Sequence, residues 1–173
     1  MAFLPAYLIK PKIKCAFQQE KEEILLLVRA HPITQIYWLI NGVFILVLLF
    51  LGNFFFPLFL TLKQTLFLNF LIIFFVFSYW WFNFLSWYFN AGLITNRRVI
   101  DIDFHSLIYK EVTSANLNKI EDITIKTGGF FQSLFNYGNV FIQTAGAEIN
   151  IEFYKVPNPE RVKELVNNLL PNS

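Results

Sequence analysis

Residues 36–56 read IYWLINGVFILVLLFLGNFFF, and residues 66–89 read LFLNFLIIFFVFSYWWFNFLSWYF. They lie within residues 30–62 and 64–96, two runs without Asp, Glu, Lys or Arg that are separated by Lys63. A helix needs about 20 apolar residues to cross a hydrocarbon layer of about 30 Å. The sequence therefore predicts two transmembrane helices, one in each stretch.

The composition of the whole chain indicates a small membrane protein. Of its 173 residues, 55% are hydrophobic and only 15% are charged, with 22 Phe, one Cys and a net charge of +2. These values exclude a disordered chain and a disulfide-stapled domain, and they give no sign of nucleic-acid binding. The remaining residues could not cover two helices that are apolar on every side, so a soluble fold is also disfavoured.

The connector between the two stretches, residues 57–65, is short, so the helices are expected to form an antiparallel hairpin with both chain ends on one side. Five cations precede the first stretch, two closely follow the second, and the connector holds one. In order along the chain these cations are Lys10, Lys12, Lys14, Lys21, Arg29, Lys63, Arg97 and Arg98. The positive-inside rule then predicts an integral membrane protein with both termini in the cytoplasm.

The N-terminal residues carry no recognisable targeting signal. Residues 1–9 lack an early positive charge, and Pro5 interrupts their apolar run, so they do not read as a signal peptide. They are expected to rest on the membrane surface or to be disordered. Cys15 has no partner cysteine and is expected to be an unreactive thiol in a reducing cytoplasm.

From Ala91 onward the pattern changes to short alternating runs. Residues 99–104 place Ile100 and Ile102 on one face of a strand and Asp101 and Asp103 on the other. Similar runs follow at residues 107–112, 120–127, 139–145 and 148–156, with turn residues between them. The alternation predicts an antiparallel meander of about six strands.

Two further segments complete this domain. Asn158 is a good N-cap and Pro159 suits the first helical position, and the apolar spacing after them predicts a capping helix that ends before Pro171. Residues 22–30 contain an apolar run that suits a strand covered on both faces, and we favour a strand that joins the sheet. A short helix is the alternative for this segment.

The sequence thus predicts an α+β membrane protein with three parts. Residues 1–35 form an N-terminal cytoplasmic segment, residues 36–89 form the two-helix transmembrane hairpin, and residues 90–173 form a cytoplasmic antiparallel β domain with a C-terminal capping helix.

Several short motifs in the second half resemble those of a known family. They are LITNRRVI at residues 93–100, YGNV at 137–140, TAG at 144–146 and PNPE at 157–160. These motifs, over about residues 20–170, resemble the bacterial PH-like (YdbS-like) membrane proteins. The resemblance implies a pleckstrin-homology-like fold, a bent seven-stranded sheet closed by a helix. It implies no established reaction, because this fold hosts many unrelated functions.

The residue inventory gives little support to catalysis. His31 and His105 are the two histidines, and there is no glycine-rich phosphate loop, so neither a metal site nor a cofactor is expected. Asp101 and Asp103 point to the same side, as an acid/base pair would need, but their alternation with isoleucine favours a solvent-exposed face of the sheet. We therefore expect no enzyme activity.

Arg97 and Arg98 are the candidate lipid-binding residues. They are expected to lie in the first β-turn of the domain with little core packing. In eukaryotic PH domains the corresponding hairpin commonly carries cations that hold phosphoinositide headgroups. The plainer interpretation is a nonspecific attraction to anionic lipid, worth about 1 kcal/mol for each residue. With eight basic and nine acidic residues from Asn90 onward, the domain is not expected to bind nucleic acid.

The hairpin offers one candidate polar contact. Asn41 and Asn83 would lie at equal depth if the turn is centred near residue 62, so they are predicted to form an interhelical hydrogen-bonded pair. The absence of ionisable residues from the two stretches argues against a transporter or pump.

The function predicted from the sequence is a membrane-anchored PH-like module that acts as a protein-interaction or scaffold domain at the cytoplasmic face. A partner segment would add a strand to a sheet edge or occupy a groove beside the last helix. The alternatives are an anionic-lipid headgroup sensor and a structural subunit of an envelope or transport complex. The expected partners are the lipid bilayer and an unidentified protein, and self-association is left open.

Overall fold

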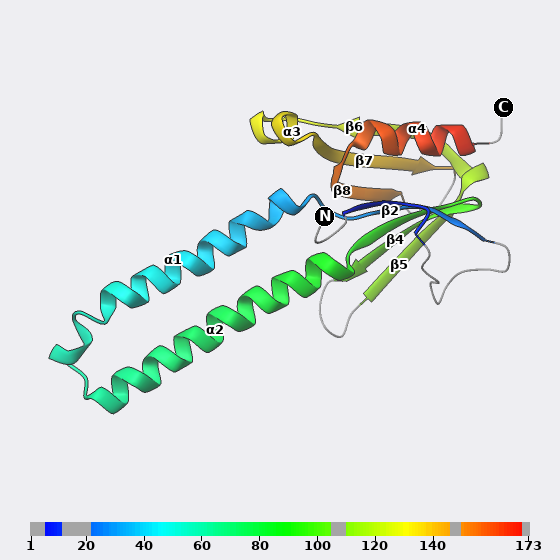
Figure 1. Ribbon diagram of the computed structural model, residues 1–173. Helices are drawn as coiled ribbons and strands as arrows, with labels where there is room; N and C mark the ends of the chain where they lie inside the picture. Colours follow the sequence, from blue (N-terminus) through cyan, green and yellow to red (C-terminus); the bar gives the residue numbers. More distant parts are fainter. Residues whose placement is uncertain (1–5, 12–21, 105–109, 146–149, 171–173) are drawn as a thin grey trace. The chain divides into compact units, whose positions relative to one another are not determined.

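The computed structural model describes residues 6–11, 22–104, 110–145 and 150–170 (Figure 1). The chain forms two compact units. Gln35–Ser86 is one, and the described residues of Met1–Thr34 and Trp87–Ser173 together form the other. The expectations for Cys15 and His105 lie outside the described residues.

The smaller unit is built from two long apolar helices. The 3-10 turn η1 (Pro32–Gln35) leads into α1 (Ile36–Gly52), η2 (Phe56–Leu58) lies in the connection, and α2 (Leu62–Phe89) follows. The predicted start of the first helix and end of the second are confirmed, whereas the connection lies earlier than expected, so that Lys63 belongs to the first turn of α2. Two helical segments, Pro32–Gly52 and Leu62–Phe89, are long and apolar enough to span a membrane. The mean hydropathies of their most apolar 18 residues are 2.0 and 1.8.

A glycine lets the two helices pack closely. A Cβ added at Gly42 of α1 would lie only 2.0 Å from Nε1 of Trp80 on α2. The indole therefore occupies the space that a side chain at residue 42 would take. Gly42 therefore gives the Trp80 ring a place between the two helices.

The hydrogen-bonded amide pair of the hairpin is formed by Asn53 and Asn69. Each side chain donates to the other, at 3.1 Å from Asn53 Nδ2 and 2.8 Å from Asn69 Nδ2. Asn83 instead donates to the carbonyl of Tyr79 in its own helix, at 2.8 Å, and no hydrogen bond joins it to Asn41. The structure thus does not form the predicted Asn41–Asn83 pair, because equal depth does not ensure that two side chains share an interface.

We expect a double-mutant cycle to show the coupling of Asn53 and Asn69. Their separate and combined replacement by Ala should give a coupling of about 1 kcal/mol, because each amide left alone loses its hydrogen-bond partner between two apolar helices. The measurement is unfolding of the hairpin in mixed detergent micelles. The matched control cycle, with Asn41→Ala and Asn83→Ala, should give a coupling near zero. Equal coupling in both cycles would contradict the pairing.

The larger unit contains two antiparallel sheets. The first has the order β1-β2-β3-β4-β5, and the second has the order β6-β7-β8, with the short turn η3 (Leu117–Lys119) between β5 and β6. The strands are β1 (Tyr7–Ile9), β2 (Ile24–Val28), β3 (Ala91–Thr95), β4 (Arg98–Phe104), β5 (Lys110–Asn116), β6 (Ile120–Lys126), β7 (Tyr137–Thr144) and β8 (Ile151–Pro157). The six strands expected after Ala91 are therefore present.

The N-terminal residues belong to this unit. β2 pairs with β3, which confirms the strand predicted within residues 22–30. β1 pairs with β2 through Tyr7, Leu8 and Ile9. The expectation that residues 1–9 rest on the membrane or are disordered is wrong for this strand, because three residues suffice to extend an apolar sheet edge.

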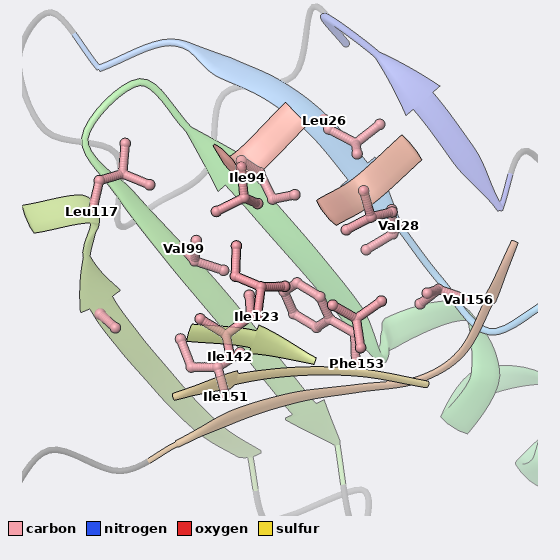
Figure 2. Close-up of a cluster of buried hydrophobic side chains, with 14 residues drawn as sticks. Leu26, Val28, Ile94, Val99, Leu117, Ile123, Ile142, Ile151, Phe153 and Val156 are labelled. Atoms are coloured by element: carbon pink, nitrogen blue, oxygen red, sulfur yellow. The ribbon is translucent and has the colours of Figure 1, made fainter. Parts of the chain in front are cut away.

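The main core lies between the two sheets and the C-terminal helix α4 (Pro159–Leu169). Figure 2 shows Leu26, Val28 and Ile94 of the first sheet facing Ile142 and Phe153 of the second. Val162 and Val166 of α4 are fully buried in the same cluster.

The predicted start of α4 is confirmed, although its cap differs from the expectation. Asn158 has a left-handed backbone with φ of 48° and makes no side-chain capping bond. Its Oδ1 instead accepts a hydrogen bond from Nδ2 of Asn136 at 2.8 Å. The asparagine thus connects two segments of the domain as well as preceding the helix.

The five-stranded sheet is apolar on its second face as well. Ile24, Leu27, Leu93 and Ile100 form a separate buried cluster there, and Leu8 and Ile102 pack against it. The isoleucines of β4 therefore face away from the main core, which leaves the aspartates of the same strand on the inner face.

Candidate functional site

A pocket of about 130 Å³ lies in the larger unit, where the polar end of β4 meets β8. Its lining includes three carboxylates together with cationic, phenolic and amide side chains. The polar residues of the lining are Arg29, Asn90, Asp101, Asp103, Glu152 and Tyr154. The pocket thus gathers groups from four segments that are distant in sequence.

β4 supplies the first two carboxylates because its inner face changes character along the strand. Val99 is fully buried in the main core, Asp101 comes next on the same face and is 9% exposed, and Asp103 follows at the half-buried rim. The predicted solvent-exposed face is therefore wrong for Asp101. The alternation identified the two faces of the strand, but it could not tell which face meets the second sheet.

A glycine opposite Asp101 makes room for the aromatic ring of Phe153, which lines the pocket from β8. Gly92 of β3 pairs with Asp101 in the register of the sheet. A Cβ at Gly92 would lie 2.4 Å from Cε1 of Phe153, so the aromatic ring of β8 packs directly on the glycine backbone. Asp101 consequently lies between an apolar core and a polar rim.

The environment of Asp101 favours its protonated form. Burial raises the pKa of Asp101 to about 7, the negative charges of Asp103, Glu152 and Glu111 add to this effect, and a backbone hydrogen bond from Ile102 opposes it. A buried carboxyl among other carboxylates can release its proton near neutral pH, and it becomes easier to ionise when a cation arrives.

The other side chains of the pocket are held by neighbours. The Tyr154 hydroxyl donates to Oε2 of Glu152, and this bond raises the pKa of the phenol. Arg29 lies with its Cζ 4.5 Å from the centre of the Tyr88 ring, and burial lowers its pKa while Tyr88 opposes the shift. Asn90 accepts a hydrogen bond from the backbone N–H of Phe104.

The carboxylates of the pocket do not form a metal site. Within residues 6–11, 22–104, 110–145 and 150–170, no group of three or more His, Cys, Asp or Glu side chains is arranged to hold an ion. The three carboxylates could instead take an organic cation, which needs a pocket and nearby negative charge but no fixed coordination geometry.

The two arginines predicted to contact a lipid headgroup have different environments. Arg97 is exposed in the turn between β3 and β4. Arg98 donates through Nε and Nη2 to the two carboxylate oxygens of Glu22, at 2.9 and 3.1 Å. The Glu22 side chain is 0% exposed and also accepts from Thr95 Oγ1 at 2.8 Å. The expectation of little core packing is therefore wrong for Arg98.

Sequence reasoning did not identify Glu22, Glu152 or Tyr154 as partners of these groups. The alternation of residues 148–156 places Glu152 and Tyr154 on the face opposite Ile151 and Phe153 and gives no sign of a pocket there. A weak signal was available in β4, because the alternation places the apolar Val99 on the same face as Asp101 and Asp103. Nothing in the sequence indicates that Glu22 lies beside Arg98.

A match to a known protein family agrees with this architecture. The family profile described as "Bacterial PH domain" matches residues 37–170, which include both apolar helices and most of the β domain. No curated protein matches the chain. Among solved structures, the chain is similar to a DUF1696 family protein with a pleckstrin-homology domain from Shewanella loihica PV-4, with 15% identity over 47% of this chain and 71% of that chain and a TM-score of 0.39. Because the family match extends over more than half of its length, the chain belongs to the bacterial PH domain family.

Proposed function

We propose that this protein is a membrane-anchored PH-like module that binds a protein partner at the cytoplasmic face of a bacterial membrane and has no catalytic role. The anchoring rests on α1 and α2, because the most apolar 18-residue stretches of these two helical segments are only 11% and 6% buried within the chain. Such apolar surface requires lipid or protein around it. The excess of cations before α1 and after α2 over the single Lys63 favours cytoplasmic termini.

The observation that carries the partner assignment is the acidic pocket. Asp101, Asp103 and Glu152 together favour a positively charged group over an anionic one. β8, which contributes Glu152 and Tyr154, is an edge strand of its sheet. A partner segment that adds a strand at this edge could place a lysine or arginine side chain in the pocket.

We expect photo-crosslinking at the pocket rim to capture this partner. A photoreactive amino acid in place of Tyr154, which is 57% exposed, should give a discrete protein adduct in native membranes. Adding Asp103→Asn and Glu152→Gln should lower the adduct yield about tenfold, since two of the three carboxylates are lost.

The matched control carries the same photoreactive amino acid at Asn168, an exposed position on α4. An adduct of equal yield at both positions, or one that is insensitive to the carboxylate changes, would contradict the pocket as the binding site. An adduct with lipid in place of protein would favour the headgroup-sensor alternative. That alternative is weakened because Arg98 is bonded to Glu22, so that Arg97 is the exposed cation of the turn.

A further inference from the structure

The short helix α3 (Phe130–Phe135) was not predicted, and it carries apolar side chains that the described part of the domain leaves exposed. Phe130 is 75% exposed, Phe131 56% and Leu134 60%. No charged residue occurs between Lys126 and Glu148 in the sequence. A soluble surface rarely gathers such large apolar groups without a function.

The backbone and the polar groups around α3 are held by local bonds. Gln132 accepts a hydrogen bond from the Gly128 N–H at 2.7 Å, and Asn136 donates to Asn158 at 2.8 Å. Gly129 has φ of 103°, a left-handed conformation that glycine adopts without strain. The exposed phenylalanines therefore lie in a segment whose Gln132 and Asn136 side chains already have hydrogen-bond partners.

The position of α3 in the domain connects it to the chain that enters the first apolar helix. Phe135 lies with its ring 6.4 Å from that of His31, and the His31 ring stacks on Tyr137 at 5.6 Å. The His31 N–H also donates to the carbonyl of Lys155 at 2.7 Å. Because His31 directly precedes Pro32, where the first candidate span begins, α3 lies at the end of the domain from which that span departs.

We propose that α3 inserts Phe130, Phe131 and Leu134 into the interface of the same bilayer that anchors the hairpin, so that a lipid surface covers these side chains. The proposal rests on the membrane anchoring proposed above. Insertion removes large apolar groups from water, and the segment contains no charge that would have to lose its hydration. The domain would then be attached at three places, its two junctions with the helices and α3, and its rotation over the membrane would be restricted.

The test uses the full chain in lipid nanodiscs, with Cys15→Ser as background and one fluorescent label on an introduced cysteine. The emission of a label at Phe131→Cys should fall about threefold when the nanodisc contains lipids with a nitroxide just below the headgroup. A label at Leu48→Cys in α1 is the control for a position embedded in lipid. A label at Asn168→Cys in α4 is the control for a position in water. Adding Phe130→Ser and Leu134→Ser should abolish the quenching at residue 131, which excludes insertion by the dye alone.

Each outcome separates this proposal from the function it rests on. Quenching at residues 48 and 131 but not at 168 supports insertion of α3. Quenching at 48 alone overturns the insertion and leaves the membrane anchor in place. If residue 48 is not quenched, both proposals fail. If residue 131 is protected from an aqueous quencher but not quenched by the lipid nitroxide, protein covers α3, and the lipid assignment is wrong.

Discussion

Arg98→Glu is expected to prevent the β domain from folding stably, whereas Arg97→Glu should leave it intact. The substitution replaces the cation that bonds both oxygens of Glu22 by a second carboxylate, at a site where the Glu22 side chain is fully buried. Breaking a buried ion pair by removing one partner costs about 3–5 kcal/mol, and the added repulsion increases the loss. Arg97 is exposed, so its reversal should cost less than about 0.5 kcal/mol.

Urea unfolding of the full chain in detergent would measure this difference. Trp87 is buried in the domain and donates to the Ala30 carbonyl at 2.7 Å, so its fluorescence reports the domain once Trp38, Trp80 and Trp81 are replaced by Phe. As a further control, Arg98→Met combined with Glu22→Leu should be far more stable than Arg98→Met alone, because no buried charge is left without its counterion. Equal stability of Arg98→Glu and the parent protein would show that the ion pair does not support the fold.

The contrast between these arginines also decides how a lipid role can be tested. Reversal of both residues would weaken lipid binding simply by unfolding the domain. Only Arg97→Glu alters the charge of the turn while leaving the buried pair with Glu22 unchanged. Loss of a preference for one anionic headgroup in that single variant would therefore be specific evidence for the sensor alternative.

Sequence patterns predicted most elements of the fold because each element has a local signature. Runs of uncharged apolar residues located α1 and α2, and a continuous apolar run located β2. Alternation located most of the strands after Ala91, and the Asn158-Pro159 pair located the start of α4. α3 was missed because its six residues are too few to show a helical period.

The candidate site was less predictable because it depends on packing between distant segments. The alternation in β4 is compatible with either face being buried, and the choice is made by a second apolar cluster that occupies the isoleucine face. The same limit applies to Glu22 and Arg98, which are separated by the whole hairpin in sequence. Glu22 lies just before β2 and Arg98 begins β4, and the two residues meet across β3, which lies between those strands. The periodicity of a single sequence therefore predicts helices and strands well, but it does not predict which side chains meet in a site.

Asp101→Asn is expected to stabilise the domain strongly at pH 8 and hardly at all at pH 4. The pKa of Asp101 rises from an ordinary value of 3.8 to about 7 in the folded protein, so the folded state binds the proton more tightly than the unfolded state. Stability therefore falls as the pH rises from about 4 to about 7, by about 1.4 kcal/mol for each pH unit and roughly 4 kcal/mol in all. Asparagine has the same shape as aspartate but does not ionise, so the variant should not lose stability in this way as the pH rises.

Urea unfolding followed through Trp87 at pH 4, 6 and 8 would show whether the gain grows with pH as this argument requires. Asp103→Asn is the matched control, because Asp103 lies two residues further along the same face but is half-buried, and it should give a much smaller gain. A gain from Asp101→Asn that does not change with pH would mean that burial does not perturb this carboxyl.

If a basic group of a partner occupies the pocket, its binding should in addition lower the pKa of Asp101, since a nearby cation favours the ionised carboxylate. The stability that the free domain loses when Asp101 ionises would then be recovered in the complex. A pocket that lowers the stability of the free domain at neutral pH is what we expect if the site serves to bind a partner.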